Sequence, residues 1–292
     1  MKITKKKLAE IVENTENEEK LKNTLQYIFS FEENIGLFGY FFFCSYTTQP
    51  YAKFHYEVLE MMNDKGDTAV AAPRHHAKST LIGLIWLLWL VVNKKEKYIV
   101  YVSQNHSKTI QFLDPIRNEL KYNDLLRKIY NLELRSAKDE DGRDREDCYD
   151  IKGCRIEAVS FEKNLRGFKH FEMRPTLIVL DDIEDDERVL NPDLRLKDAN
   201  KLNKVIIPSR DINGRIKFIG TILHIDSLLI KKIRLWNGKI YSACDEEMSE
   251  ESILWKERWS KERLLKEKYD IGSIEFQQEY RNNPIDNATA II

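Results

Sequence analysis

Short strand-like runs and longer helical patterns alternate through the middle of the chain. Short runs of apolar or alternating residues, typical of strands, stand at 67–72, 97–103, 177–180 and 214–221. Segments with the apolar spacing of helices follow two of these runs, at 78–93 and 105–121. Because strands that alternate with helices form parallel sheets covered on both faces, the pattern predicts an α/β fold with a mainly parallel central sheet flanked by helices.

The pattern changes toward both ends of the chain. Residues 1–30 carry apolar positions spaced for two short amphipathic helices, whereas the chain after residue 231 turns to charged helical segments. Between them, residues 148–160 predict a β-hairpin with Lys152 and Gly153 at its turn. We therefore expect three parts: an N-terminal helical appendage at 1–45, an α/β core at 46–230 and a small helical lid or linker subdomain at 231–292.

Composition and charge exclude some classes of protein. With 42% hydrophobic and 33% charged residues, the chain has the composition of a soluble globular protein. The 47 basic and 48 acidic residues exclude a uniformly basic nucleic-acid binder, but they allow a basic patch on one face. The longest apolar run, Leu81–Val92, is shorter than the roughly 20 residues that a bilayer span needs, so it predicts a buried helix.

Residues 72–80 stand between a predicted strand and a predicted helix, as the Walker A loop GxxxxGK[ST] does. Such a P-loop binds phosphate with backbone N–H groups, while a lysine and a hydroxyl supply an ammonium group and a Mg²⁺ ligand. Lys78 and Ser79 stand at those two positions, but alanines replace the glycines. An alanine is tolerated where φ is negative, whereas a left-handed one costs roughly 1–2 kcal/mol. The predicted nucleotide-binding residues of the loop are Ala72, Pro73, Arg74, His75, His76, Ala77, Lys78, Ser79 and Thr80.

Acidic residues follow the apolar run 177–180, as in a Walker B strand. Asp181 is the predicted Mg²⁺ ligand together with Ser79, and either Asp182 or Glu184 is the predicted base that polarises the attacking water. In a parallel sheet we expect the acids and the loop to meet at the carboxyl ends of adjacent strands, where such sheets bind ligands. Taken alone, the acids are also typical of any solvated loop after a buried strand.

In this order the motifs resemble the ATPase domain of a tailed-bacteriophage terminase large subunit, the motor that packages DNA into proheads. The resemblance covers about residues 45–285 and rests on four segments, 72–80, 165–187, 220–229 and 253–284. It implies a P-loop NTPase of the ASCE or RecA-like class that hydrolyses ATP with Mg²⁺ and translocates double-stranded DNA. In this family glycines commonly stand where His75 and Ala77 stand.

The resemblance implies roles for further residues. Lys78 would contact the β- and γ-phosphates, and Arg74 would sense the γ-phosphate. Gly220, Thr221 and His224 match a coupling motif, which reports hydrolysis to the DNA-gripping elements. Arg166 stands where related motors send an arginine into the neighbouring subunit, a contact that contributes about 10³–10⁵ in rate. The segment that packs on adenine is matched by Gln49, Pro50 and Phe54.

The resemblance also implies partners and a location. It implies double-stranded DNA, a portal protein, a small terminase subunit and a homo-oligomeric ring such as a pentamer, docked on the prohead in the host-cell cytoplasm without a membrane. No acidic strand follows the last helical segment, so we expect the C-terminal nuclease domain and its activity to be absent. Two alternatives remain open: a degenerate, non-hydrolysing P-loop module for assembly or DNA binding, favoured by Ala72, His75 and Ala77, and a helicase-like ATPase.

Overall fold

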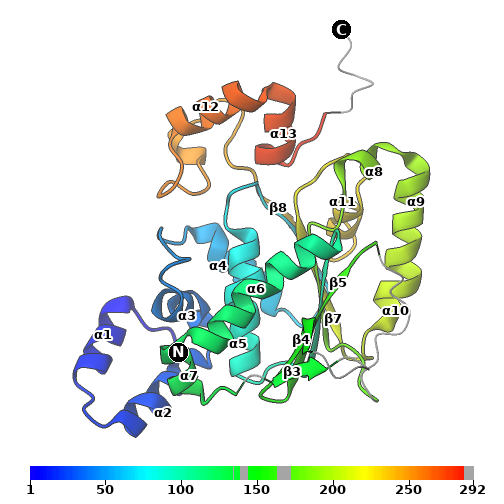
Figure 1. The fold of residues 1–292 in the computed structure, drawn as a ribbon. Coiled ribbons are helices and arrows are strands. Elements are labelled where there is room, and N and C mark those ends of the chain that lie inside the picture. Colours follow the sequence, from blue (N-terminus) through cyan, green and yellow to red (C-terminus); the bar gives the residue numbers. More distant parts are fainter. Residues whose placement is uncertain (134, 139–143, 163–171, 286–292) are drawn as a thin grey trace.

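The computed structural model describes residues 1–133, 135–138, 144–162 and 172–285, and a single sheet forms its centre (Figure 1). Within these residues the sheet has eight strands in the order β3-β4-β5-β2-β6-β7-β1-β8. Only the β3–β4 and β4–β5 pairs are antiparallel. The predicted α/β class with a mainly parallel sheet is thus confirmed. The strands are β1 (Thr68–Ala71), β2 (Tyr98–Ser103), β3 (Arg135–Lys138), β4 (Asp144–Ile151), β5 (Cys154–Ser160), β6 (Leu177–Asp181), β7 (Arg215–Gly220) and β8 (Asn237–Ile240).

Strand β1, which precedes the P-loop, and strand β6, which ends at the acids, are not neighbours in the sheet. Strand β7 lies between them and is parallel to both, with Gly220 opposite Ala71 and Ile219 opposite Asp181. The expectation that loop and acids follow adjacent strands is therefore wrong by one strand. Parallel strands are joined by crossovers, so a strand late in the sequence can enter the middle of the sheet. As a consequence, the end of β7 lies between the loop and the acids.

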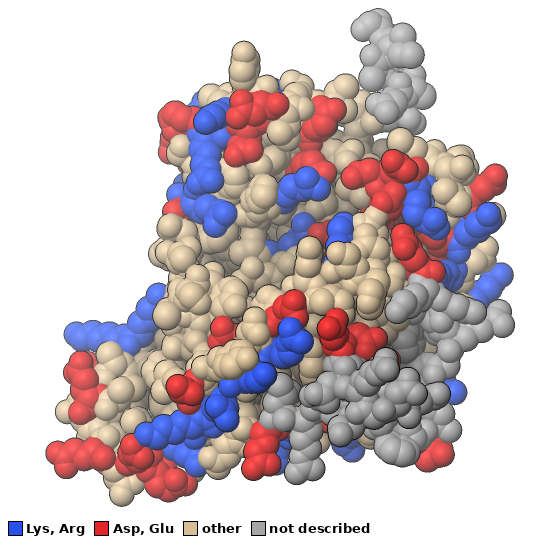
Figure 2. Space-filling view, viewed as in Figure 1, with Lys and Arg blue, Asp and Glu red and all other residues tan. Residues whose placement is uncertain are grey.

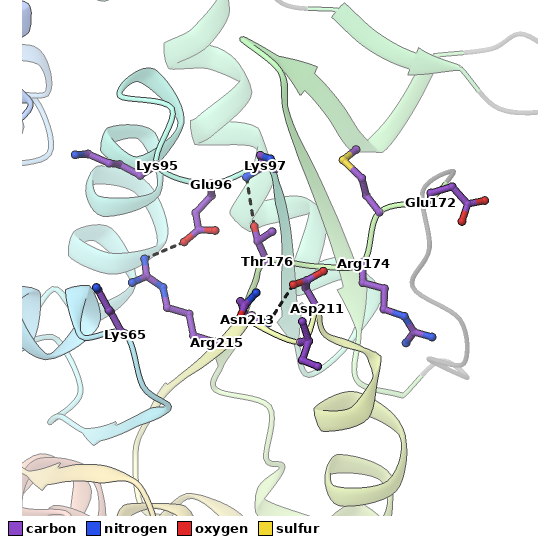
Figure 3. Close-up of a pocket in the computed structure, with 13 residues that line it drawn as sticks. Lys65, Lys95, Glu96, Lys97, Glu172, Arg174, Thr176, Asp211, Asn213 and Arg215 are labelled. Atoms are coloured by element: carbon purple, nitrogen blue, oxygen red, sulfur yellow. Dashed lines mark hydrogen bonds and ion pairs between the residues drawn. The ribbon is translucent and has the colours of Figure 1, made fainter.

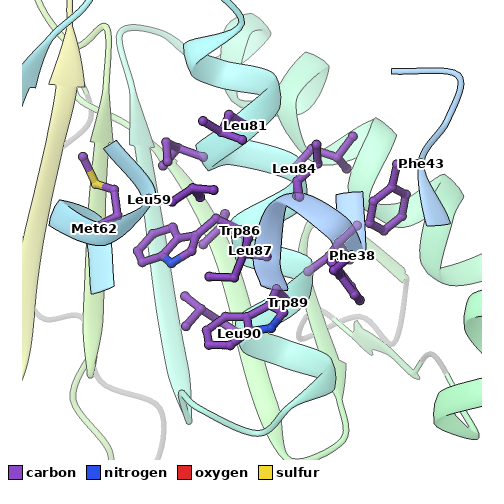
Figure 4. Close-up of a cluster of buried hydrophobic side chains, with 14 of the residues drawn as sticks. Phe38, Phe43, Leu59, Met62, Leu81, Leu84, Trp86, Leu87, Trp89 and Leu90 are labelled. Atoms are coloured by element: carbon purple, nitrogen blue, oxygen red, sulfur yellow. The ribbon is translucent and has the colours of Figure 1, made fainter. Parts of the chain in front are cut away.

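Helices cover both faces of the sheet (Figure 1), and the helix after the P-loop is buried along most of its length. It consists of a π-helical part, η2 (Ser79–Trp86), and a continuing α-helix, α5 (Leu87–Val92). All residues from Leu81 to Val92 are buried, as predicted (Figure 4). No helix in the described part of the chain is long and apolar enough to cross a membrane.

The N-terminal helices pack on this buried helix. The two amphipathic helices predicted in residues 1–30 are confirmed as α1 (Lys5–Glu13) and α2 (Glu18–Phe29). Phe29 stacks edge-on against Phe38 at 5.7 Å, and its carbonyl accepts a hydrogen bond from Trp89 Nε1 at 2.6 Å. The appendage therefore shares the core of the sheet domain. The other helices of this half are η1 (Glu32–Asn34), α3 (Ile35–Phe42), α4 (Lys53–Asn63), α6 (His106–Tyr122) and α7 (Asp124–Tyr130).

The predicted hairpin at residues 148–160 is confirmed by β4 and β5. Ile151 pairs with Cys154, and the two turn residues have positive φ values of 49° at Lys152 and 80° at Gly153. Left-handed residues at both central positions are what a tight hairpin turn of this length requires.

The second half of the chain adds one strand that the sequence pattern did not indicate, whereas its last two helices fall within the charged helical segments expected after residue 231. Strand β8 pairs in parallel with β1, so the sheet continues past residue 230, where the sequence placed the end of the core. Helices α12 and α13 lie above the carboxyl ends of the strands (Figure 1). The helices of this half are α8 (Asp186–Leu190), α9 (Pro192–Lys201), η3 (Leu202–Ile206), α10 (Ile207–Ser209), α11 (Leu228–Ile233), η4 (Glu250–Ser252), α12 (Lys261–Ile271) and α13 (Ser273–Arg281).

Candidate functional site

The ammonium group of Lys78 lies between the ends of β6 and β7. Its Nζ donates a hydrogen bond to Thr221 Oγ1 at 3.0 Å and lies 3.3 Å from Asp182 Oδ2. The Lys78 side chain is only 10% exposed, so this ion pair is largely shielded from water. The structure thus brings together residues from three separate motifs: the loop lysine, the acid after β6 and the threonine after β7.

Asp181 is buried at the end of β6, with 6% of its surface exposed. Its Oδ2 accepts a hydrogen bond from the Tyr101 hydroxyl, whereas its Oδ1 has no hydrogen-bond partner among the described residues. Burial and the neighbouring Asp182 carboxylate raise the pKa of Asp181 to about 6. An unpartnered buried carboxylate oxygen costs free energy, and a bound hard cation would satisfy it. Asp181 therefore fits the predicted role of a Mg²⁺ ligand.

Asp182 leaves the strand in a left-handed conformation, with φ at 43°. Its N–H donates to Ile219 O at 3.1 Å, and its Oδ1 accepts from Thr221 N at 3.2 Å, so these two hydrogen bonds join the end of β6 to the end of β7. Gly220 permits this approach, because a Cβ there would lie 3.1 Å from Asp182 Oδ1. The Asp182 side chain is 42% exposed, so its carboxylate can reach a water molecule.

Glu184, the other predicted base, points to a different partner. Its two carboxylate oxygens accept hydrogen bonds from the first turn of α11, from Leu228 N at 2.6 Å and Leu229 N at 3.0 Å. Burial raises the pKa of Glu184 to about 7. A carboxylate at a helix N-terminus satisfies free N–H groups and the positive end of the helix dipole. Of the two candidate bases, geometry therefore favours Asp182.

Two residues of the P-loop are left-handed. His75 has φ at 61° and Ala77 has φ at 58°, whereas Ala72 keeps a negative φ. An alanine is therefore tolerated at position 72, where φ is negative. The left-handed conformation of Ala77 costs roughly 1–2 kcal/mol. Strained conformations of this kind persist where the surrounding structure enforces them, often at functional sites.

The side chain of His76 points into the core. It is fully buried, its ring stacks on Trp259 at 5.5 Å with 9° between the planes, and its Nδ1 lies 2.8 Å from Arg74 O. Burial lowers the pKa of His76 to about 3, so the imidazole is neutral. The side chain therefore anchors the loop to the helical subdomain, and only the backbone of His76 can serve a ligand. His75, its neighbour, is exposed.

Helix α13 also holds the loop, through Glu279. The Arg74 N–H donates to Glu279 O at 2.8 Å, and Arg74 Nε lies 2.8 Å from Glu279 Oε2. Burial raises the pKa of Glu279, while the Arg74 guanidinium opposes this shift. No sequence motif marks Glu279. The predicted γ-phosphate sensor is thus held by an acid of α13.

The predicted adenine segment lies beside the lid. Phe54 is 4% exposed and packs against Tyr241 at 5.6 Å and His76 at 6.0 Å, as a core residue does. Gln49 and Pro50 are exposed, and Pro50 O accepts a hydrogen bond from Trp255 Nε1 at 2.7 Å. Their contact with adenine stays a prediction.

Two further predicted residues are not placed at the loop. His224 accepts a hydrogen bond from Asp226 N at 3.0 Å through its Nδ1, within the turn that precedes α11. Arg166 lies outside the described residues. Their roles in coupling and in trans remain predictions.

A hollow of about 380 Å³ opens beside the carboxylates, and Ser79, Thr80, Asp181 and Asp182 line it. Both predicted metal ligands therefore face one space. A larger hollow of about 800 Å³ lies at the opposite, amino edge of the sheet and contains none of the predicted residues (Figure 3). Basic and acidic side chains are interspersed over the face seen in Figure 2, in agreement with the balanced charge.

Comparison with known proteins finds likeness only among solved structures. No family model matches the chain. No curated protein matches it either. The HK97 bacteriophage large terminase superposes with a TM-score of 0.54 at 16% identity, covering 80% of this chain and 51% of that one. The chain therefore spans about half the length of that protein.

Two structures of a terminase ATPase domain match over nearly their whole length. The large terminase ATPase domain of Thermus phage P74-26 gives a TM-score of 0.52 at 14% identity and covers 78% of this chain and 92% of that one. A mutant of the same domain gives 0.55 at 12% identity and covers 83% and 98%. The chain thus has the fold of phage large terminase ATPase domains, in agreement with the α/β class predicted from the sequence.

Proposed function

We propose that this chain is the ATP-hydrolysing motor domain of a viral DNA-packaging terminase. The observation that carries the proposal is the meeting of Lys78, Asp182 and Thr221 beside the buried, half-satisfied Asp181. These residues lie at one end of the neighbouring strands β1, β7 and β6, where open α/β sheets bind ligands. The terminase-like fold supports the same assignment.

Each group has a chemical task in this proposal. Lys78 would pair with the β- and γ-phosphates, and the Ser79 hydroxyl and Asp181 would hold Mg²⁺, which prefers oxygen ligands. When bound, the ion neutralises phosphate charge. Asp182 orients the attacking water and accepts its proton.

Substrate binding would itself free the base. In the described state the Lys78 ammonium is engaged by Asp182 Oδ2 and Thr221 Oγ1. A triphosphate competes for the ammonium because it carries more charge than a single carboxylate. Once Lys78 turns to the phosphates, Asp182 loses its ion-pair partner and becomes available to a water molecule.

The cellular role extends the proposal beyond the site. The motor would act on double-stranded DNA through phosphates rather than bases, in a homo-oligomeric ring with a portal protein and a small terminase subunit. Arg166 would act in trans, and Arg74 and Thr221 would report the state of the nucleotide. The motor would work in the host cytoplasm on a prohead. Balanced charge allows this, because only the basic residues that face DNA need contact it.

ATP turnover of the wild type and of Lys78→Ala tests the proposal. We expect Mg²⁺-dependent hydrolysis in the wild type, stimulated by duplex DNA, and a loss of about 10² or more in the variant, because it removes the phosphate-binding charge. Lys239→Ala is the matched control, since Lys239 also bonds a carboxylate, Glu57 at 2.6 Å, but on the edge strand. Turnover that Lys78→Ala leaves unchanged would overturn the proposal.

The left-handed His75 and Ala77 favour one second candidate, a P-loop module that assembles on DNA without hydrolysis. The two candidates differ in a direct observation. Absence of turnover at high protein concentration with DNA and Mg²⁺, together with retained DNA binding, would favour the module. Strand separation during turnover would favour the helicase-like alternative.

A further inference from the structure

Tyr101 connects the neighbouring strand β2 to the acid at the end of β6. It is 1% exposed, and its hydroxyl donates a hydrogen bond to Asp181 Oδ2. A buried phenol and a buried carboxylate each cost free energy without a partner, so their bond satisfies both groups. Strand β2 pairs directly with β6, which sets the reach of the side chain.

The orientation of the Tyr101 ring is fixed by face-to-face stacking against a second aromatic ring. Phe112 of α6 stacks on it with ring centroids 3.4 Å apart and 3° between the planes. Phe112 in turn lies against Gly83 in the helix after the P-loop, where an added Cβ would fall 1.9 Å from the ring. Any side chain at position 83 would displace Phe112. The glycine therefore lets Phe112 fit between the helix that carries Gly83 and the Tyr101 ring, which it holds in one orientation.

We propose that Tyr101 is a positioning residue for the metal-binding carboxylate of Asp181. It occupies Oδ2 and leaves Oδ1, which has no hydrogen-bond partner among the described residues, as the oxygen that would be available to an ion. The inference rests on the proposed function, in which Asp181 holds Mg²⁺. Hydrogen-bond partners behind a metal ligand fix its orientation, and their loss typically costs about 10–100-fold in metal affinity or activity.

Tyr98 provides a matched control on the same strand. It is also 1% exposed, and its hydroxyl donates to a carboxylate of a neighbouring strand, Glu157 Oε2 on β5, at 2.6 Å. Its side chain faces the other side of the sheet and belongs to the other core cluster. Tyrosine-to-phenylalanine changes at 98 and 101 thus remove the same kind of bond, but only one of them touches the site.

Metal binding in the full chain tests the inference. Mn²⁺ binding would be followed by electron paramagnetic resonance with a non-hydrolysable ATP analogue, and the Mg²⁺ activation constant and the KM for ATP would be measured in turnover. For Tyr101→Phe we expect the Mn²⁺ Kd and the Mg²⁺ activation constant to rise about tenfold, and the KM for ATP at saturating Mg²⁺ to change less than about twofold. Tyr98→Phe should change none of the three.

The outcomes separate the inference from the proposed function. Equal Mn²⁺ affinity in the wild type and Tyr101→Phe, or an equal loss in Tyr98→Phe, overturns the positioning role. A wild type without turnover contradicts the proposed function, while the Mn²⁺ comparison still decides the positioning role. Phe112→Leu provides a second variant that keeps the hydroxyl and removes the clamp. It should weaken Mn²⁺ binding severalfold, and unchanged binding would contradict the inference.

Discussion

Hollows of different size and different chemistry lie at the two ends of the strands of the central sheet. We call these ends the amino edge and the carboxyl edge. The amino edge has the larger one, about 800 Å³, against about 380 Å³ at the carboxyl edge. At the amino edge, Arg215 Nη2 lies 2.9 Å from Glu96 Oε1, and Asp211 Oδ1 accepts from Asn213 N at 3.0 Å (Figure 3). Among the described residues the buried Arg215 Nε has no hydrogen-bond partner, but the guanidinium it belongs to is ion-paired. The larger hollow is a surface in which these polar groups are already engaged.

At the carboxyl edge the charges are incompletely satisfied. Asp181 is buried, and its Oδ1 has no hydrogen-bond partner of good geometry among the described residues. It lies beside a shielded lysine that bonds Asp182 and Thr221. Desolvated groups with perturbed pKa values mark functional sites more often than volume alone does. The chemistry of the residues that line a hollow, rather than the size of the hollow, therefore identifies the site.

The largest expected effect separates the acids of the two edges. Asp182→Asn should lower ATP turnover by about 10²-fold or more, because the amide cannot accept the proton of water. It should lower the free energy of unfolding by only about 1 kcal/mol or less, because the Asp182 end of its ion pair with Lys78 is 42% exposed. Turnover and thermal unfolding measure the two quantities.

Glu96→Gln at the amino edge should give the opposite result. The change removes one charge from a shielded ion pair, with side chains 15% and 9% exposed, so stability should fall by about 1–3 kcal/mol. Turnover per folded molecule should stay the same. A loss of turnover in Glu96→Gln equal to that in Asp182→Asn would contradict the placement of the catalytic site at the carboxyl edge alone.

The second effect concerns pH. Burial lowers the pKa of His76 to about 3 from 6.5, so below pH 6.5 the unfolded chain takes up a proton that the folded chain does not. Stability is therefore lost as the pH falls, by about 2 kcal/mol between pH 6.5 and 5 from this residue. His76→Phe keeps a ring against Trp259 and should remove that part of the slope.

Denaturant unfolding of both proteins at pH 8, 6.5 and 5 measures the difference. Other titrating groups, such as Asp181 and Glu184, are present in both proteins and cancel. At pH 8 the variant should be about 1 kcal/mol less stable, because it loses the hydrogen bond with Arg74 O. Parallel slopes in the two proteins would refute the assignment of a buried neutral imidazole.

The third effect tests the threonine between the two motifs. Thr221→Val preserves shape but removes the oxygen that accepts the Lys78 hydrogen bond, which should lower DNA-stimulated turnover about tenfold. Thr221→Ser keeps the hydroxyl and should stay near wild type. Steady-state hydrolysis with and without DNA measures both. Wild-type turnover in Thr221→Val would remove the hydroxyl from the mechanism.

The sequence predicts those parts of the molecule that carry their own local signal. The buried strands and the helix after the loop have clear apolar patterns, and Lys78 and Asp181 stand at fixed places in recognisable motifs. Strand β8 escapes because all four of its residues are exposed, so no apolar pattern exists. Helix α9 likewise contains no buried residue.

Features that arise from packing between distant segments leave no local signal. The insertion of β7 between β1 and β6 is a property of the whole sheet, and it places Thr221 beside Lys78. In the sequence, Tyr101 is an ordinary aromatic residue of a buried strand. Its contact with Asp181 becomes visible only when β6 is placed beside β2. Glu279 likewise becomes part of the site only when α13 contacts the loop. Motif positions could be predicted, whereas the residues that hold them could not.

The smallest expected effect lies in the backbone of the carboxyl edge. Ala77→Gly should stabilise the protein by about 0.5–1 kcal/mol, because the relief of a left-handed alanine exceeds the entropy that glycine adds to the unfolded chain. Ala72→Gly is the matched control at a negative φ and should destabilise by about 0.5–1 kcal/mol. Denaturant unfolding without nucleotide measures both changes. Opposite signs at two alanines of one loop would show that conformation, not composition, sets the cost, whereas equal destabilisation would contradict strain at Ala77.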